Sequence, residues 1–113
     1  MSEEEEKIIN DKLSIAKNPN SKEETLISLA DDKSVYVREY LAKNPNCPTL
    51  VLDKLADDQV DSVRQAVASN LNCSYEALKK LSKDSNFWVA LNVINNIQTR
   101  HHLNFRCLMY LLL

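Results

Sequence analysis

The sequence contains no glycine in its 113 residues, although average usage would supply about eight. Phosphate-binding loops, dinucleotide-binding turns and nucleophile elbows all need glycine at tight backbone positions, so enzymes built on these loops are excluded. With 44% hydrophobic and 27% charged residues, the chain has the composition of one globular domain.

An excess of positive charge is also missing. Fourteen Lys and Arg residues stand against 16 Asp and Glu residues, which gives a net charge of −2. This balance disfavours binding to nucleic acid or to an acidic membrane surface. No apolar run approaches the roughly 18 residues of a membrane span. The acidic start of the chain, residues 1–6, is unlike the basic start of a signal peptide. We therefore expect a cytoplasmic protein with no membrane contact.

What the sequence does have is a repeat of 26 residues. Residues 16–41 align without gaps on residues 42–67, and 12 of the 26 positions are identical. Residues 68–93 keep the frame, and residues 94–113 begin a fourth copy that stops after 20 residues. Residues 1–15 have the pattern of a capping helix. The sequence thus predicts one repeat domain, in which 94–113 is a partial repeat or a C-terminal capping segment.

The apolar residues in each copy follow a helical period. In the first copy Leu26, Leu29 and Ala30 lie at i, i+3 and i+4, which predicts a helix of about ten residues. Val37 and Leu41 mark a second short helix. Two short helices cannot enclose a core alone, so each unit must pack on its neighbours. We expect an all-α solenoid of about three and a half repeats.

The second copy is typical of a known repeat. It reads Ala42-Lys43-Asn44-Pro45-Asn46-Cys47-Pro48, then Leu52, Leu55-Ala56-Asp57-Asp58 and Val63-Arg64. This pattern resembles the leucine-rich repeat variant family, and the resemblance covers residues 14–99. It implies a right-handed superhelix of alternating α-helices and short 3₁₀ helices, related to HEAT repeats. It also implies a recognition scaffold with no catalytic residue.

Asparagine stands at the same place in all four copies, as Asn18, Asn44, Asn70 and Asn96. An asparagine side chain bonds local backbone, and the residue tolerates left-handed geometry. We therefore expect a ladder of asparagines inside the turns. Contact of these amides with a ligand is the alternative.

An aspartate and an arginine six residues later recur in two copies. Asp32 with Arg38, and Asp58 with Arg64, predict a ladder of ion pairs between repeats, which ends because the third copy has Ala90 in place of the arginine. Capture of a phosphate or carboxylate by these arginines is the alternative.

The cysteines lack the spacing of a metal or cluster site, because none belongs to a C-x₂-C pair. Cys47 and Cys73 occupy equivalent positions, and stacked repeats would place them about 8–10 Å apart, beyond the roughly 7 Å limit of a disulfide. Adjacent His101 and His102, followed by Cys107, have no further residue at ligand spacing. We expect free thiols, no metal and no cofactor.

Partner choice in a solenoid lies on the face that stacking leaves free. The second helices present a mixture of aromatic, amphipathic and polar residues there, which is typical of a recognition surface. We call these candidate partner-binding residues the candidate row: Tyr36, Glu39, Lys43, Gln65, Trp88 and Leu91. The alternative is that Phe87 and Trp88 belong to the core, covered by residues 100–113.

The last residues, 105–113, are too apolar for a solvated tail and too short to cross a bilayer. Either they fold back as a cap on the third repeat, or they form an edge for further repeats, a second subunit or a parent chain.

Together these features predict a scaffold that binds a protein partner and is not an enzyme. The alternatives are a HEAT-like module that binds nucleic acid, and a purely structural fragment of a larger assembly. The candidate row contains a single lysine, which counts against nucleic acid.

Overall fold

The computed structural model describes residues 1–101 and 112. In this part of the chain all of the regular secondary structure is α-helical, and no strand is present. The α-helices are α1 (Glu3–Lys17), α2 (Glu23–Ser28), α3 (Val35–Lys43), α4 (Thr49–Leu55), α5 (Asp61–Ser69), α6 (Tyr75–Leu81) and α7 (Phe87–His101). The all-α class predicted from the periodicity is confirmed.

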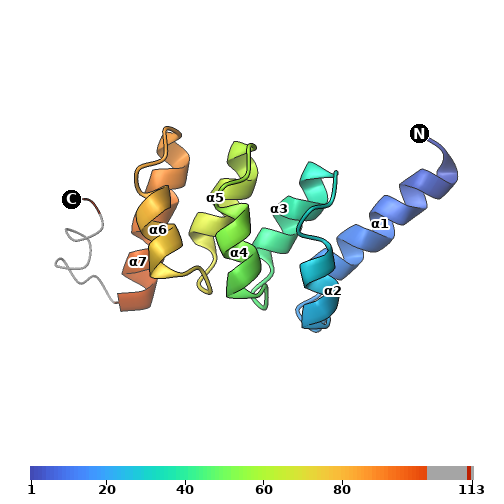
Figure 1. Ribbon diagram of the computed structural model, residues 1–113, viewed down its shortest axis with the longest axis horizontal. Helices are drawn as coiled ribbons and strands as arrows, with labels where there is room; N and C mark the ends of the chain where they lie inside the picture. Colours follow the sequence, from blue (N-terminus) through green and yellow to red (C-terminus); the bar gives the residue numbers. More distant parts are fainter. Residues whose placement is uncertain (102–111, 113) are drawn as a thin grey trace.

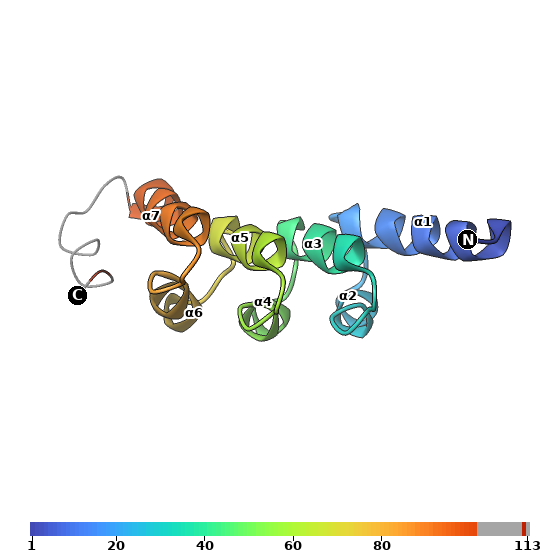
Figure 2. The ribbon, with the colours of Figure 1, turned by 90° about the horizontal axis from the view of Figure 1, so that it is seen from above.

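The helices stand in two rows (Figure 1). Helices α1, α3, α5 and α7 lie side by side in one row, and Figure 2 shows α2, α4 and α6 in a second row beside it. The closest packing is between successive members of the first row, α1 with α3, α3 with α5, and α5 with α7. The N-terminal turns of α3, α5 and α7 lie along the same edge of the molecule (Figure 1).

The core recurs with the period of the sequence. Leu26, Leu52 and Leu78 are fully buried in the second row, and Val37, Val63 and Val89 are fully buried in the first. Burying one such side chain stabilises the fold by about 1.5–3 kcal/mol. Each copy therefore supplies equivalent apolar side chains to one continuous core between the rows.

The helices of the second row are shorter than the ten residues expected. α2 has six residues, and α4 and α6 have seven each. Leu29 and Ala30 are buried as predicted, but they lie in the turn that follows α2. The described residues contain no 3₁₀ helix of the kind that the family resemblance implied.

Asparagine ends three helices of the first row, because Asn18, Asn44 and Asn70 follow α1, α3 and α5. Their φ angles are −76°, −66° and −81°, so the left-handed geometry considered for them is wrong. The chain leaves the helix in an extended conformation that needs no glycine. α7 instead continues past Asn96 to His101. The prolines that follow Asn18 and Asn44 disfavour a continued helix there, but Leu71 follows Asn70 and α5 still ends, so proline is not required for the helix to stop.

None of these helices, within the residues that the structure describes, combines the length and the apolar character needed to cross a membrane.

Candidate functional site

The predicted asparagines link successive repeats through their side-chain amides. The Nδ2 atom of Asn44 donates to the carbonyl oxygens of Ala16 and Asn18, at 2.8 and 3.0 Å. These carbonyls belong to the end of α1, where no intrahelical donor is available. The same bonds recur in the next copies, from Asn70 to Ala42 and Asn44, and from Asn96 to Ala68 and Asn70. We call Asn44, Asn70 and Asn96 the asparagine ladder.

The other end of each amide closes the local turn. The Oδ1 atom of Asn44 accepts the N–H of Asn46 at 2.9 Å, and the Oδ1 atom of Asn70 accepts that of Asn72 at the same distance. Both asparagines are buried, with 2% and 7% exposed. Because donors and acceptors are satisfied by backbone, these side chains hold the fold and offer nothing to a ligand.

The exposed Asn18 makes only the local bond, to the N–H of Asn20. At the other end of the ladder, the Oδ1 atom of Asn96 is buried and has no hydrogen-bond partner within the part of the chain that the structure describes. In the other copies this oxygen accepts the N–H two residues later. Because α7 continues through Asn96, that N–H donates to a carbonyl oxygen inside the helix and is not available to the amide.

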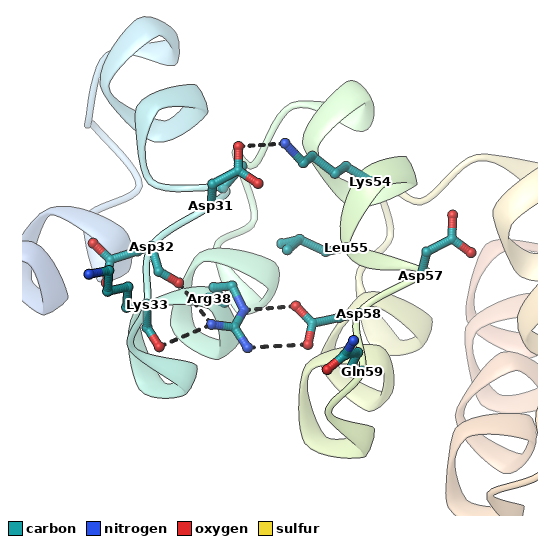
Figure 3. A pocket seen from close by; sticks show the side chains of 10 residues that line it. Asp31, Asp32, Lys33, Arg38, Lys54, Leu55, Asp57, Asp58 and Gln59 are labelled. Atoms are coloured by element: carbon teal, nitrogen blue, oxygen red, sulfur yellow. Dashed lines mark hydrogen bonds and ion pairs between the residues drawn. The ribbon is translucent and has the colours of Figure 1, made fainter.

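The predicted ion pairs form between repeats, but with different partners. The Nε atom of Arg38 donates to Asp58 of the next copy at 2.8 Å, while its Nη1 atom donates to the backbone oxygen of Asp32 at 2.8 Å (Figure 3). The carboxylate that neutralises the arginine therefore lies 20 residues later in the sequence. Pairing of Arg38 with the Asp32 carboxylate, as the six-residue spacing suggested, is wrong.

Arg64 repeats this geometry, with Nε 2.8 Å from Asp84 and Nη1 2.7 Å from the backbone oxygen of Asp58. Lys12 occupies the equivalent position in α1 and contacts the Asp32 carboxylate at 2.7 Å. The pairs Lys12–Asp32, Arg38–Asp58 and Arg64–Asp84 form the ion-pair ladder. Each aspartate also accepts the N–H of the residue two positions later, which fixes the turn before the next helix.

The ion pairs favour the charged forms of Asp32, Asp84 and Arg64. Burial opposes ionisation of Asp32, but the hydrogen bond from Lys12, the N–H of Ser34 and the positive charges nearby outweigh it and hold the pKa of Asp32 below its ordinary value. Burial likewise opposes ionisation of Asp84, and the hydrogen bond from Arg64 leads the interactions that nevertheless lower its pKa. The bond to Asp84 is the largest cause of the raised pKa of Arg64.

A cavity of about 360 Å³ lies beside the Arg38–Asp58 pair (Figure 3). Lys54 closes one side of it through an ion pair with Asp31 at 2.6 Å. All three guanidinium nitrogens of Arg38 already donate to protein oxygens. A phosphate could bind the arginine only by displacing a carboxylate, so the geometry favours the structural interpretation of this ladder.

The candidate row is exposed at its aromatic members. Tyr36 and Trp88 are 66% and 59% exposed, in the first turns of α3 and α7. Gln65 and Leu91 are half-buried. The structure does not bring the two aromatic side chains together, because α5 lies between their helices and has Ser62 at the equivalent position (Figure 1).

Two other members of the row form a pair. The Nζ atom of Lys43 lies 3.1 Å from Glu39, one turn away in α3. Lys43 also lies over the ring of Tyr40, at 5.3 Å from the ring centroid. The only lysine of the row is thus engaged with its own helix.

Phe87 extends the aromatic surface of Trp88. It is 68% exposed, and the two rings meet edge to face with centroids 5.5 Å apart. One expectation from the sequence is that residues 100–113 cover Phe87 and Trp88. Most of these residues lie outside the part of the chain that the structure describes.

A second set of exposed apolar side chains was missed by the sequence reasoning. Leu50, Leu71 and Tyr75 are 70%, 55% and 51% exposed, at the turns that precede or begin the helices of the second row. The guanidinium of Arg100 lies 5.5 Å from the centre of the Tyr75 ring. The signal in the sequence that could have identified them is the presence of apolar residues at turn positions of a repeat.

Cys47 and Cys73 are free thiols, each with at most 2% of its surface exposed. Burial raises the pKa of each thiol to about 12. At the equivalent position the Ser21 hydroxyl donates to the carbonyl oxygen of Ile15 at 2.8 Å. The residues that the structure describes contain no cluster of three or more His, Cys, Asp or Glu side chains able to hold a metal ion.

No protein-family model, curated protein or solved structure matches this chain. The resemblance to the leucine-rich repeat variant family thus remains a prediction made from the residues of the repeat.

Proposed function

We propose that this chain is a right-handed α-solenoid of about three and a half repeats, of the leucine-rich repeat variant type. The support is the recurrence of the same contacts at the spacing of the sequence repeat. The asparagine ladder and the ion-pair ladder each join a residue of one copy to the adjacent copy. Contacts that pass only between neighbouring units are the physical basis of a solenoid.

We further propose that the solenoid is a non-catalytic scaffold that binds a protein partner through the candidate row. The observation that carries this proposal is the exposure of Tyr36 and Trp88 at equivalent positions of two helices. Tyrosine and tryptophan are enriched among the residues that dominate binding energy, because they bury a large area and lose few rotamers.

The surroundings of these aromatic rings suit an interface with a protein. Glu39 and Lys43 provide a polar border on α3, and Phe87 enlarges the apolar area around Trp88. Aromatic anchors within a polar border are the common composition of protein interfaces. Because α5 lies between Tyr36 on α3 and Trp88 on α7, a partner that contacts both side chains must extend along the helix row.

The charges of the same surface do not favour nucleic acid. Lys43 is paired with Glu39, and Arg38 and Arg64 are paired with aspartates. A nucleic-acid backbone is bound through cations that exchange with condensed counterions, so unpaired lysine and arginine would be needed.

Photo-crosslinking in cells tests the proposed surface. A photoreactive amino acid is placed at Tyr36 or Trp88, and at Leu50 as the matched control, because Leu50 is equally exposed but belongs to the other helix row. We expect the same partner protein to be crosslinked from positions 36 and 88 and not from position 50. Crosslinking from position 50 alone would place the interface on the second row.

The captured partner then allows an affinity measurement. Trp88→Ala should weaken binding by tenfold or more, since hot-spot truncations cost about 2 kcal/mol or more. Leu50→Ala should leave the Kd unchanged. If both substitutions leave it unchanged, the candidate row is not the binding surface.

A further inference from the structure

A cleft of about 830 Å³ separates the first turns of α1 from the start of α3. Figure 1 shows α1 diverging from α3 toward its N-terminus. Most of the exposed lining is apolar, and Met1, Ile9, Val35 and Tyr36 are among the residues that line the cleft. Ile9 and Val35 are half-buried, so the apolar floor of this N-terminal cleft is open to a ligand.

The α1 wall of the cleft is acidic. Glu6 lines the cleft, and the exposed Glu3, three residues earlier and therefore a neighbour of Glu6 on the helix surface, adds a second negative charge. The positive charge of Lys12 at the cleft is neutralised by Asp32, at 2.7 Å. The exposed Lys33 stands on the α3 side. A ligand that suits the α1 wall is therefore apolar with positive charge beside it.

The last residues of the chain have this chemistry. Residues 102–113 contain nine apolar or aromatic side chains, with Arg106 and His102 and without any Asp or Glu. They follow α7, whose C-terminal end lies at the far end of the helix row from α1 (Figure 1). The acidic cleft and the start of this basic, apolar segment thus belong to opposite ends of the row.

We propose that the N-terminal cleft binds residues 102–113 of a second copy of this chain. Apolar side chains of the segment fill the floor formed by Ile9 and Val35, and Arg106 lies beside Glu6. The contact is heterologous, because each copy contributes a different surface. Such contacts produce open chains unless the rotation between copies closes a ring.

This self-association goes beyond the proposed partner binding and can fail independently of it. Tyr36 lines the cleft and also belongs to the candidate row, so the variants that test self-association are placed at Ile9, Glu6 and the C-terminal segment, which are outside that row. Trp88→Ala, which tests partner binding, leaves the cleft unaltered.

Sedimentation equilibrium over a range of concentrations measures the association. We expect the average mass of the wild-type chain to rise steadily with concentration and not to stop at a dimer. Ile9→Arg puts a cation on the apolar floor and should weaken association by tenfold or more. Ile8→Arg is the matched control, since Ile8 is 53% exposed on the same helix but does not line the cleft.

A second pair of variants tests the acidic wall of the cleft. Glu6→Lys should weaken association, and Glu4→Lys, on the opposite face of the same turn, should do so much less. Combining Glu6→Lys with Arg106→Glu should restore part of the loss, because the exchanged charges attract again. High salt should weaken the wild-type contact.

A mixing experiment separates this contact from nonspecific stickiness. Ile9→Arg keeps an intact C-terminal segment, whereas a full-length chain with Leu108→Glu and Leu111→Glu keeps an intact cleft. Each variant alone should be monomeric, and an equimolar mixture should form a one-to-one heterodimer. Circular dichroism establishes that both variants retain their helices.

Three results would overturn the proposal. The first is a wild-type chain that is monomeric at all concentrations. The second is equal association of Ile8→Arg and Ile9→Arg, which would show that the cleft is not involved. The third is a mixture of the two folded variants that stays monomeric.

Discussion

The side chain of Asn44 donates a hydrogen bond to the carbonyl oxygen of Ala16, which lies 28 residues earlier at the end of α1. In many proteins a glycine after a helix lets the chain fold back and bond these last carbonyls locally. This chain has no glycine. The neighbouring repeat supplies the donor instead, so the end of one helix is completed only when the next repeat is stacked on it.

Removing an amide from the middle of the asparagine ladder should destabilise the fold. Asn70→Ala deletes the donor to the carbonyl oxygen of Ala42, which then stays buried without that partner, and it deletes the acceptor for the N–H of Asn72. The carbonyl oxygen of Asn44 keeps its bond from the N–H of Cys47, at 2.9 Å. Unpaired buried polar groups cost about 1–3 kcal/mol each. We expect the free energy of unfolding, measured by urea denaturation, to fall by about 1–3 kcal/mol.

The matched control is Asn18→Ala. Asn18 is exposed and makes only its local bond to Asn20, so the loss should be below about 1 kcal/mol. Equal losses at positions 18 and 70 would show that the bonds between repeats contribute little.

The two kinds of ion pair should differ in their contribution to stability. The Arg64 and Asp84 side chains are 14% and 10% exposed, whereas Lys80 and Asp57, which also pair, are 57% and 61% exposed. Arg64→Ala leaves the mostly buried carboxylate of Asp84 with only the N–H of Asn86 as a partner, and should cost about 2 kcal/mol or more. Lys80→Ala should cost less than about 1 kcal/mol. Thermal or urea denaturation of both variants measures this difference, and a larger effect for Lys80→Ala would contradict it.

Acid should weaken the fold through Asp32 and Asp84. Their pKa values lie below 3.8 in the folded chain, so the unfolded chain binds protons first as the pH falls. The stabilisation is complete above about pH 4–5 and is lost as the pH drops through 3.8 toward the folded pKa values. The free energy of unfolding should therefore rise with pH between about 2 and 4. In Asp84→Asn this rise should be smaller, and an unchanged slope would exclude Asp84 as its source.

The buried thiols should resist modification in the folded chain. With a pKa of about 12 for Cys47 and Cys73 against 9.0 for an ordinary thiol, the thiolate population near pH 8 falls by roughly a thousandfold. In a Cys107→Ser background, a thiol reagent should react with both cysteines far more slowly in buffer than in urea. Rapid reaction in buffer, with circular dichroism unchanged, would show that the thiols are accessible.

Much of the fold follows from the sequence alone, because equivalent apolar positions of the 26-residue repeat are buried in each copy. The buried positions of Leu26, Val37 and Leu41 follow from their helical spacing. Helix lengths do not follow as well. Leu29 and Ala30 continue the helical pattern beyond the end of α2, since a residue in a turn can face the core as well as a residue in a helix.

The candidate site was less predictable than the fold. The exposure of Tyr36 agrees with its position on the free face of α3. The N-terminal cleft and the exposed Leu50 were not foreseen, because a cleft depends on the angle between two helices and exposure at a turn depends on the neighbouring repeat.

The sequence by itself determined that this chain is built from repeated helices and that asparagine, aspartate and arginine recur between them. Only the tertiary structure decided which residues they bond. Arg38 lies six residues after Asp32 in the sequence, yet stacking brings the carboxylate of Asp58 to its guanidinium and leaves Asp32 to contribute a backbone oxygen. Spacing along one chain fixes neighbours within a repeat, whereas pairing across repeats depends on how the units are rotated and displaced as they pack.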